Sequence, residues 1–368
     1  MRHCSQVELT TNLRKNTTPI QPEYELQHSE LPLIISVPWP RTLDLVFSAV
    51  AREKLMEMYR IVECEADEIN DLGDEILSRA RFIIGQPPLS TETLNRMGHL
   101  RCIFNVEGNL INNMPYDLLF ERGIHVLTTS RVFAQPVAEL GLAMALNLAR
   151  GIVDADLDFR CGNELWGGEG NTSARQFYGS EIGIIGFGDV GRALNGVLSG
   201  FGAKIMAFDP WLPPSILIES GVKPAALKDV LCGNDFVFAV ATVTSENQAA
   251  LGADEFACMR QGAAFILLSR AEAVDFDALM AAVKSGHILA ASDVFPKEPM
   301  PSDHPVRELK GFLRSAHRAG ALDSAFKGIG EMVLEDMDLI DRGLPPMLCK
   351  RAERETVTRF RSKPVSIN

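Results

Sequence analysis

The sequence of 368 residues lacks several features that would direct it to particular functions. Its seven cysteines are odd in number and scattered, and no two have C-x-x-C spacing, so we predict no metal site and a reducing, cytoplasmic location. The N-terminus has no apolar signal segment, and the richest apolar run, residues 140–149, is about half a membrane span, so we predict no membrane association. The formal net charge of −12 provides no broad positive field, which argues against nucleic acid as a partner.

The chain does have ample apolar material, because hydrophobic residues make up 46% of it and charged residues 23%. Its length predicts two domains. Short apolar or β-branched runs alternate with stretches of helical spacing, a pattern that predicts parallel sheets flanked by helices. The expected strands fall in two series: 33–37, 60–64, 81–85, 101–106 and 125–129, and then 181–186, 203–208, 236–241, 263–268, 288–294 and 312–316. Six strands in the second series are typical of a doubly wound nucleotide-binding domain.

A glycine motif stands at the start of the second series. Gly186, Gly188 and Gly191 form G-x-G-x-x-G directly after an expected strand and before an expected helix. These glycines permit a tight turn, the close approach of a pyrophosphate, and close helix–strand packing. Asp209 ends the next strand, where a carboxylate can accept hydrogen bonds from the adenosine ribose and would repel a 2′-phosphate. The motif therefore predicts NAD as the cofactor and favours it over NADP.

Three later segments indicate what the cofactor is used for. They read LLSRAEAVDFDAL (267–279), ASDVFPKEP (291–299) and SAHRAG (315–320). Together with the glycine motif, they resemble the signature segments of the NAD-dependent D-isomer-specific 2-hydroxyacid dehydrogenases. The resemblance implies that Arg270, Glu298 and His317 are catalytic.

The chemistry of that family requires these residue types for independent reasons. Hydride transfer to a 2-oxo acid leaves negative charge on the carbonyl oxygen, so a proton donor and a fixed cation must stand close by. His317 can supply the proton, and Glu298 can orient the ring and favour its charged form. The planar fork of Arg270 can hold the substrate carboxylate and carbonyl.

The same resemblance implies further binding residues. Asp189, Val190, Ser269 and Asp293 are expected to contact the cofactor, and Asp293 would bond the nicotinamide carboxamide. Backbone N–H groups of Glu107 and Gly108 are expected to hold the substrate carboxylate. The charge of Glu107 should oppose that carboxylate unless its side chain turns away.

The resemblance also implies an α/β fold in which a Rossmann-type, doubly wound parallel-sheet domain is inserted into a smaller flavodoxin-like substrate domain. We expect residues 1–135 to form the first part of the substrate domain, 136–320 the NAD-binding domain, and 321–368 a helix and tail that return to the first. The very apolar helix near 137–150 would lie at the interface of a homodimer.

Two alternatives stay open on sequence alone. A phosphite dehydrogenase retains the same arginine, glutamate and histidine. A corepressor-like protein that senses NAD(H) without turnover could be built on the same scaffold. Formate dehydrogenases carry glutamine where this chain has Glu298, which speaks against that reading.

Overall fold

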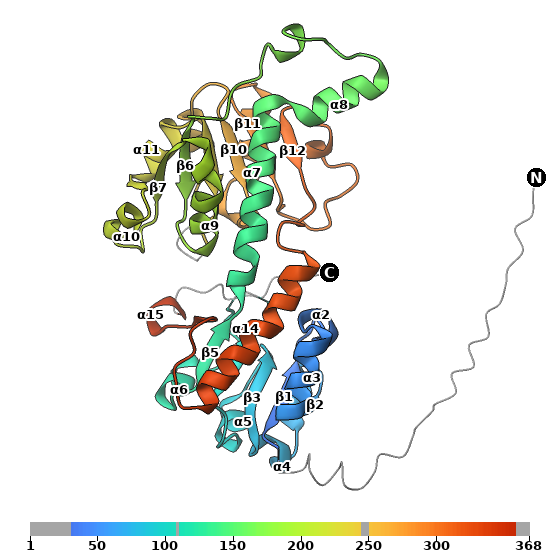
Figure 1. The fold of residues 1–368 in the computed structure, drawn as a ribbon, viewed down its shortest axis with the longest axis vertical. Coiled ribbons are helices and arrows are strands. Elements are labelled where there is room, and N and C mark those ends of the chain that lie inside the picture. Colours follow the sequence, from blue (N-terminus) through green and yellow to red (C-terminus); the bar gives the residue numbers. More distant parts are fainter. Residues whose placement is uncertain (1–30, 108–109, 244–249, 358–368) are drawn as a thin grey trace, which may run out of the picture.

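The computed structural model describes residues 31–107, 110–243 and 250–357. These residues form two α/β lobes that follow one another along the long axis of the molecule (Figure 1), each built around one sheet. We call them the first lobe, which contains β1–β5 and β13, and the second lobe, which contains β6–β12.

The sheet of the first lobe has the strand order β13-β5-β4-β3-β1-β2. All neighbouring pairs are parallel except β13 and β5. Side chains alternate between its two faces: Ile34 packs in the core beneath α2, α3 and α14, whereas Leu33 and Ile35 pack in the core on the other face. The strands are β1 (Leu33–Val37), β2 (Arg60–Glu63), β3 (Ala80–Gly85), β4 (Cys102–Asn105), β5 (His125–Thr128) and β13 (Lys350–Arg351).

The sheet of the second lobe is parallel throughout and has the order β12-β11-β10-β9-β6-β7-β8. The strand order reverses between β6 and β9, and such a switch point is where doubly wound sheets bind nucleotides. The strands are β6 (Glu181–Ile185), β7 (Lys204–Phe208), β8 (Lys223–Pro224), β9 (Phe236–Ala239), β10 (Ala264–Leu267), β11 (Leu289–Ser292) and β12 (Phe312–Arg314).

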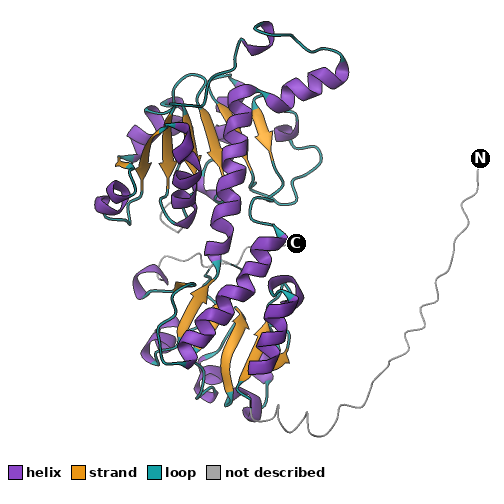
Figure 2. Ribbon diagram, viewed as in Figure 1, coloured by secondary structure: helices purple, strands orange, loops and turns teal. Residues whose placement is uncertain are grey.

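Helices cover both faces of each sheet (Figure 2). Their starts follow from local chemistry where a polar side chain precedes the helix, as when Ser48 accepts the N–H of Ala51 and Asp275 accepts that of Ala278. The helices of the first lobe are α2 (Leu43–Val46), α3 (Ala49–Met58), α4 (Asp74–Leu77), α5 (Thr91–Arg96), α6 (Tyr116–Glu121), α14 (Asp323–Asp341) and α15 (Arg354–Val357). Those of the second lobe are α7 (Ala134–Arg150), α8 (Ile152–Cys161), α9 (Asp189–Leu198), α10 (Pro214–Glu219), α11 (Leu227–Cys232), α12 (Ala253–Ala257) and α13 (Phe276–Lys284).

The chain passes between the lobes twice, each time from the carboxyl end of a strand. It leaves β5 through a 3₁₀ turn, Ser130–Phe133, into α7, and it leaves β12 through residues 315–322 into α14. Because the strands of each lobe are parallel apart from β13, all their carboxyl ends lie at the edge where these connections start. The two sheets therefore turn their carboxyl edges toward the same gap between the lobes.

The apolar helix of the sequence is α7, which lies along the sheet of the second lobe and packs against α9, β10 and β11. By length and composition, the stretch Ser130–Arg150 is the one described segment that could cross a membrane. Its buried side chains, including Val137, Met144 and Ala145, belong to a core cluster of the second lobe. The helix is therefore used in the core of an α/β lobe.

The structure adds features that the sequence did not indicate. Each sheet has one strand more than expected, namely β8 and β13, and both are only two residues long. The sequence also gave no sign of the disulfide between Cys232 and Cys258, which joins the end of α11 to the residue after α12. Short strands and distant cysteine pairs carry no periodic signal, so only the folded chain reveals them.

Candidate active site

The glycine motif has the geometry that a dinucleotide cradle needs. A Cβ on Gly186, whose φ is +93°, would lie 2.5 Å from the Ala241 Cα, and one on Gly191 would lie 2.4 Å from the Gly186 carbonyl oxygen. Neither position tolerates a side chain. A Cβ on Gly188 would meet nothing within 4 Å, so open space lies beside the N-terminus of α9. Free N–H groups at a helix N-terminus facing open space suit a pyrophosphate.

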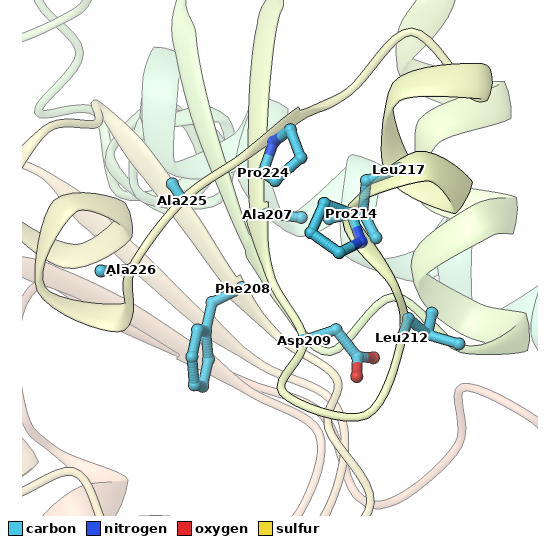
Figure 3. A pocket seen from close by; sticks show the side chains of 9 residues that line it. All are labelled: Ala207, Phe208, Asp209, Leu212, Pro214, Leu217, Pro224, Ala225 and Ala226. Atoms are coloured by element: carbon cyan, nitrogen blue, oxygen red, sulfur yellow. The ribbon is translucent and has the colours of Figure 1, made fainter.

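Asp209 connects this turn to the end of β7. One carboxylate oxygen accepts the N–H of Phe187 at 2.8 Å, and the other accepts the N–H of Trp211 at 2.9 Å. Each oxygen retains a lone pair that could accept a ribose hydroxyl. A cavity of about 340 Å³ opens beside Asp209 (Figure 3), and no basic side chain lines it; its lining residues are Ala207, Phe208, Asp209, Leu212, Pro214, Leu217, Pro224, Ala225 and Ala226. Among the described residues that line it, none carries a positive charge that could neutralise a 2′-phosphate.

Two other sequence-predicted cofactor residues lie at the start of α9. Asp189 is the first residue of the helix, and Val190 is half-buried beside it. Arg131, from the 3₁₀ turn between the lobes, has its Nε 3.6 Å from a carboxylate oxygen of Asp189. Arg131 thereby offsets negative charge next to the predicted pyrophosphate position. Sequence reasoning missed this arginine, since nothing in the local pattern marks it.

Ser269 and Arg270 follow β10 at the same edge. The Ser269 Oγ is buried and has no hydrogen-bond partner, which fits a polar group of a bound cofactor. The backbone carbonyl oxygen of Ser269 accepts a hydrogen bond from an Nη of Arg270 at 2.7 Å, and this bond helps fix the direction of the guanidinium. The buried hydroxyl and the cation thus belong to consecutive residues that follow β10.

His317 and Glu298 form a bonded pair at this edge. The His317 Nδ1 lies 2.6 Å from one Glu298 oxygen, and the other Glu298 oxygen accepts the Phe295 N–H at 2.8 Å. Partial burial opposes ionisation of Glu298, but the bonds from His317 and Phe295 and the positive charges of His317 and Arg270 outweigh it and lower its pKa. Glu298 is therefore ionised, and Nδ1 carries the proton that it donates.

The pair is reachable from the gap, because the side chains of His317 and Glu298 are 44% and 37% exposed. The positive charge of Arg270 contributes to the lowered pKa of Glu298. The structure thus pairs His317 with Glu298, and the catalytic roles of Arg270, Glu298 and His317 stay a prediction.

Asp293 holds the segment that carries His317. It is 1% exposed, and its two carboxylate oxygens accept the N–H groups of Arg318 and Ala319, each at 2.9 Å. Its carbonyl oxygen accepts the N–H of His317 at 2.7 Å. His317 has a φ of +50°, a conformation that residues other than glycine seldom adopt. The contact of Asp293 with nicotinamide stays a prediction, while its observed bonds are to this segment.

The first lobe contributes Glu107, which follows the carboxyl end of β4. Its N–H donates to the Asn105 side chain at 2.7 Å, and its expected part in holding the substrate carboxylate stays a prediction. Its carboxylate accepts from the Nε of Arg41 at 2.6 Å. Gly108 lies outside the described residues. Sequence reasoning missed Arg41, whose only signal was its place just after an expected strand.

The fold and these contacts define a class: a two-lobe, nucleotide-dependent oxidoreductase with an arginine and a histidine–glutamate pair at the carboxyl edge of its nucleotide-binding sheet. Residues 142–319 match the family model "D-isomer specific 2-hydroxyacid dehydrogenase, NAD binding domain". The crystal structure of a phosphoglycerate oxidoreductase from Rhizobium etli is 70% identical, with a TM-score of 0.83, and the match covers 89% of this chain and 100% of that one.

Curated relatives agree with this class. A glyoxylate reductase of Korarchaeum cryptofilum is 32% identical over 233 residues, which are 62% of this chain and 70% of that protein. A D-3-phosphoglycerate dehydrogenase of Methanocaldococcus jannaschii is 28% identical over 63% of this chain and 44% of that protein. The chain belongs to the D-isomer specific 2-hydroxyacid dehydrogenase family, and it is an NAD-dependent enzyme of that kind.

Proposed function

We propose that the protein reduces a 2-oxo acid to a D-2-hydroxy acid, with His317 and Glu298 as the acid/base pair and Arg270 as the substrate-orienting cation. The observation that carries this proposal is the 2.6 Å contact between His317 and Glu298 at the carboxyl edge of the nucleotide-binding sheet. The positive charge of Arg270 is one cause of the lowered pKa of Glu298.

When bound, NADH supplies the hydride that reduces the carbonyl carbon. His317 uses Nδ1 to bond Glu298, which leaves Nε2 as the ring atom that can pass a proton to the growing alkoxide. Ionised Glu298 stabilises the charged ring and fixes its plane. Arg270 binds the carboxylate and the carbonyl oxygen through its planar fork and stabilises the charge that develops there.

We propose that Gly186, Gly188, Gly191, Asp189 and Val190 hold the pyrophosphate end of the cofactor. Asp209 would accept the ribose hydroxyls, and its charge favours NAD over a 2′-phosphorylated cofactor. Ser269 and Asp293 would lie nearer the nicotinamide. The buried, unpartnered Oγ of Ser269 supports its place in this set.

We propose that residues 1–135 and 321–368 form the substrate domain and that 136–320 form the NAD-binding domain. The two connections between the lobes would then act as the hinge, and closure of the gap on cofactor and substrate would exclude water. The cytoplasm remains our proposed location.

We also propose that the protein is a homodimer. Large apolar side chains are exposed on and after α8, which projects from the second lobe (Figure 1): Leu157 is 53% exposed, Phe159 61%, Leu165 67% and Trp166 73%. Phe159 and Trp166 stack edge to face with centroids 6.4 Å apart. Such a patch indicates a protein interface. Sedimentation equilibrium tests the proposal, and a monomer at micromolar concentration would contradict it.

The test of the catalytic proposal is NADH oxidation, followed by absorbance, with glyoxylate, hydroxypyruvate and the 2-oxo acid corresponding to 3-phosphoglycerate. The names of the relatives make these the first substrates to try. Phosphite with NAD serves as the assay for the alternative activity.

The decisive variant is His317→Asn, with His99→Asn, which alters an exposed histidine before β4, as the matched control. We expect His317→Asn to bind NADH as the unaltered protein does and to lose about 10²- to 10⁴-fold in kcat. Equal turnover in the two variants would refute the role of His317. A protein that binds NADH tightly but reduces none of these acids would instead be a nucleotide sensor.

A further inference from the structure

Glu107 places a carboxylate at the edge where a 2-oxo acid anion must enter. It follows β4, so it stands at the carboxyl edge of the first sheet, the edge from which the chain passes to the second lobe. Its side chain is 32% exposed. An uncompensated negative charge at this place would repel the substrate across a short distance.

Arg41 stands directly against this carboxylate. It lies in the loop between β1 and α2, and its Nε is 2.6 Å from a Glu107 oxygen. Its side chain is only 17% exposed, so the ion pair is partly shielded from water and from salt. β1 and β4 are separated in the sheet by β3, and the contact therefore joins two loops of the same edge.

Two aromatic rings hold the guanidinium in position. Its central carbon lies 4.6 Å from the ring centroid of Phe326 and 5.5 Å from that of Phe133. Phe133 ends the 3₁₀ turn of one interlobe connection, and Phe326 lies in the first turns of α14, which follows the other. The two rings also meet edge to face at 6.3 Å. Arg41 is thus fixed at the place where both connections meet the first lobe.

We propose that Arg41 is a positioning residue for the reaction: its ion pair with Glu107 cancels the negative charge that the first lobe would otherwise present to the 2-oxo acid anion. The inference rests on the proposed reduction of such an acid. The Nε of Arg41 bonds Glu107, and its guanidinium carbon lies over the rings of Phe133 and Phe326. Its effect on the substrate runs through Glu107.

This proposal makes a specific prediction for a double-mutant cycle. Arg41→Gln should raise the KM for glyoxylate about tenfold, as expected for one unpaired like charge several ångströms from the substrate, and change kcat less than threefold. Glu107→Gln should leave KM within threefold. The double variant should recover the KM of Glu107→Gln, since the repelling charge is gone. The excess KM of Arg41→Gln should also shrink at 1 M salt.

A merely structural role would give a different pattern. The cation–π contacts are lost in both Arg41→Gln and the double variant, so damage to the fold would persist in the double variant, and salt would not relieve it. The matched control is Arg96→Gln, which removes an ion pair with Asp74 of the same 2.6 Å distance at the opposite end of the first lobe. We expect it to change neither KM nor kcat.

Binding of oxamate to the enzyme–NADH complex, followed by quenching of NADH fluorescence, gives a second readout that needs no turnover. The dissociation constants of oxamate for the unaltered protein, Arg41→Gln, Glu107→Gln and the double variant should follow the same pattern as KM. If no acid is turned over but oxamate follows the pattern, the catalytic proposal fails and the role of Arg41 stands. An equal defect in Arg41→Gln and the double variant, or no defect in Arg41→Gln, would overturn the inference.

Discussion

Asp293 offers a sharp test of how the active-site histidine is held. Asp293→Asn preserves the size of the side chain but replaces one acceptor oxygen with an NH₂ group. That group would face the N–H of Arg318 or Ala319 at a site that is 1% exposed. The variant therefore loses one charge-assisted hydrogen bond and gains a contact between two donors.

The size of the effect follows from these contacts. A hydrogen bond to a charged group contributes about 1.5–3 kcal/mol, and a buried donor left without a partner costs about 1–3 kcal/mol. The left-handed φ of His317 adds a cost of about 1–2 kcal/mol that the surrounding bonds must offset. If the segment relaxes out of this strained conformation when its hydrogen bonds to residue 293 weaken, the conformation of His317 needed for the reaction becomes about 1.5–3 kcal/mol less stable. Each 1.36 kcal/mol is a factor of ten in rate, so kcat should fall about 10- to 100-fold.

The assay is steady-state NADH oxidation together with an NADH dissociation constant from fluorescence. The control is Asp303→Asn, which changes an exposed aspartate in the following loop. We expect Asp293→Asn to lower kcat while the NADH dissociation constant stays within threefold. A kcat within twofold of the unaltered protein would refute this reasoning. A tenfold weaker NADH complex with unchanged kcat would show instead that Asp293 acts mainly on the nicotinamide.

Two further predictions concern stability. Because the fold lowers the pKa of Glu298, this residue contributes stability that is present above its ordinary pKa of 4.5 and is lost as pH falls through the lowered value. Glu298→Gln should therefore lower the free energy of unfolding, measured by urea denaturation, more at pH 7 than at pH 3. Equal losses at both pH values would contradict this prediction. Asp336 is fully buried in α14, and its carboxylate accepts hydrogen bonds from the backbone N–H groups of residues 347–349 at 2.7–3.0 Å. Asp336→Asn should therefore lower the free energy of unfolding by about 3 kcal/mol in the same assay. Asp338→Asn, in the same helix with an exposed pairing to Arg342, should cost under about 0.5 kcal/mol, and comparable losses in the two variants would count against the reasoning.

The sequence by itself determined the parts that local chemistry encodes. Strands such as Leu33–Val37 and Glu181–Ile185 could be predicted because a strand that is buried on both faces of a parallel sheet is predominantly apolar. The turn at Gly186 could be predicted because only glycine adopts its φ and lets Ala241 approach so closely. Arg270, Glu298 and His317 could be proposed as catalytic because each follows a predictable strand in a segment that resembles a family signature.

Only the tertiary structure decided which charges meet. Arg41 and Glu107 are 66 residues apart, and they pair because the strand order brings the loops after β1 and β4 to one edge of the first sheet. Arg131, in one interlobe connection, likewise pairs with Asp189 at the start of α9, 58 residues later in the chain. The sequence predicted Asp293 as a cofactor contact, and in the folded chain its carboxylate accepts hydrogen bonds from the backbone N–H groups that follow His317. Such side-chain partners depend on the path of the chain in space. The hydrophobic pattern of one segment does not indicate which distant segment will pack opposite it.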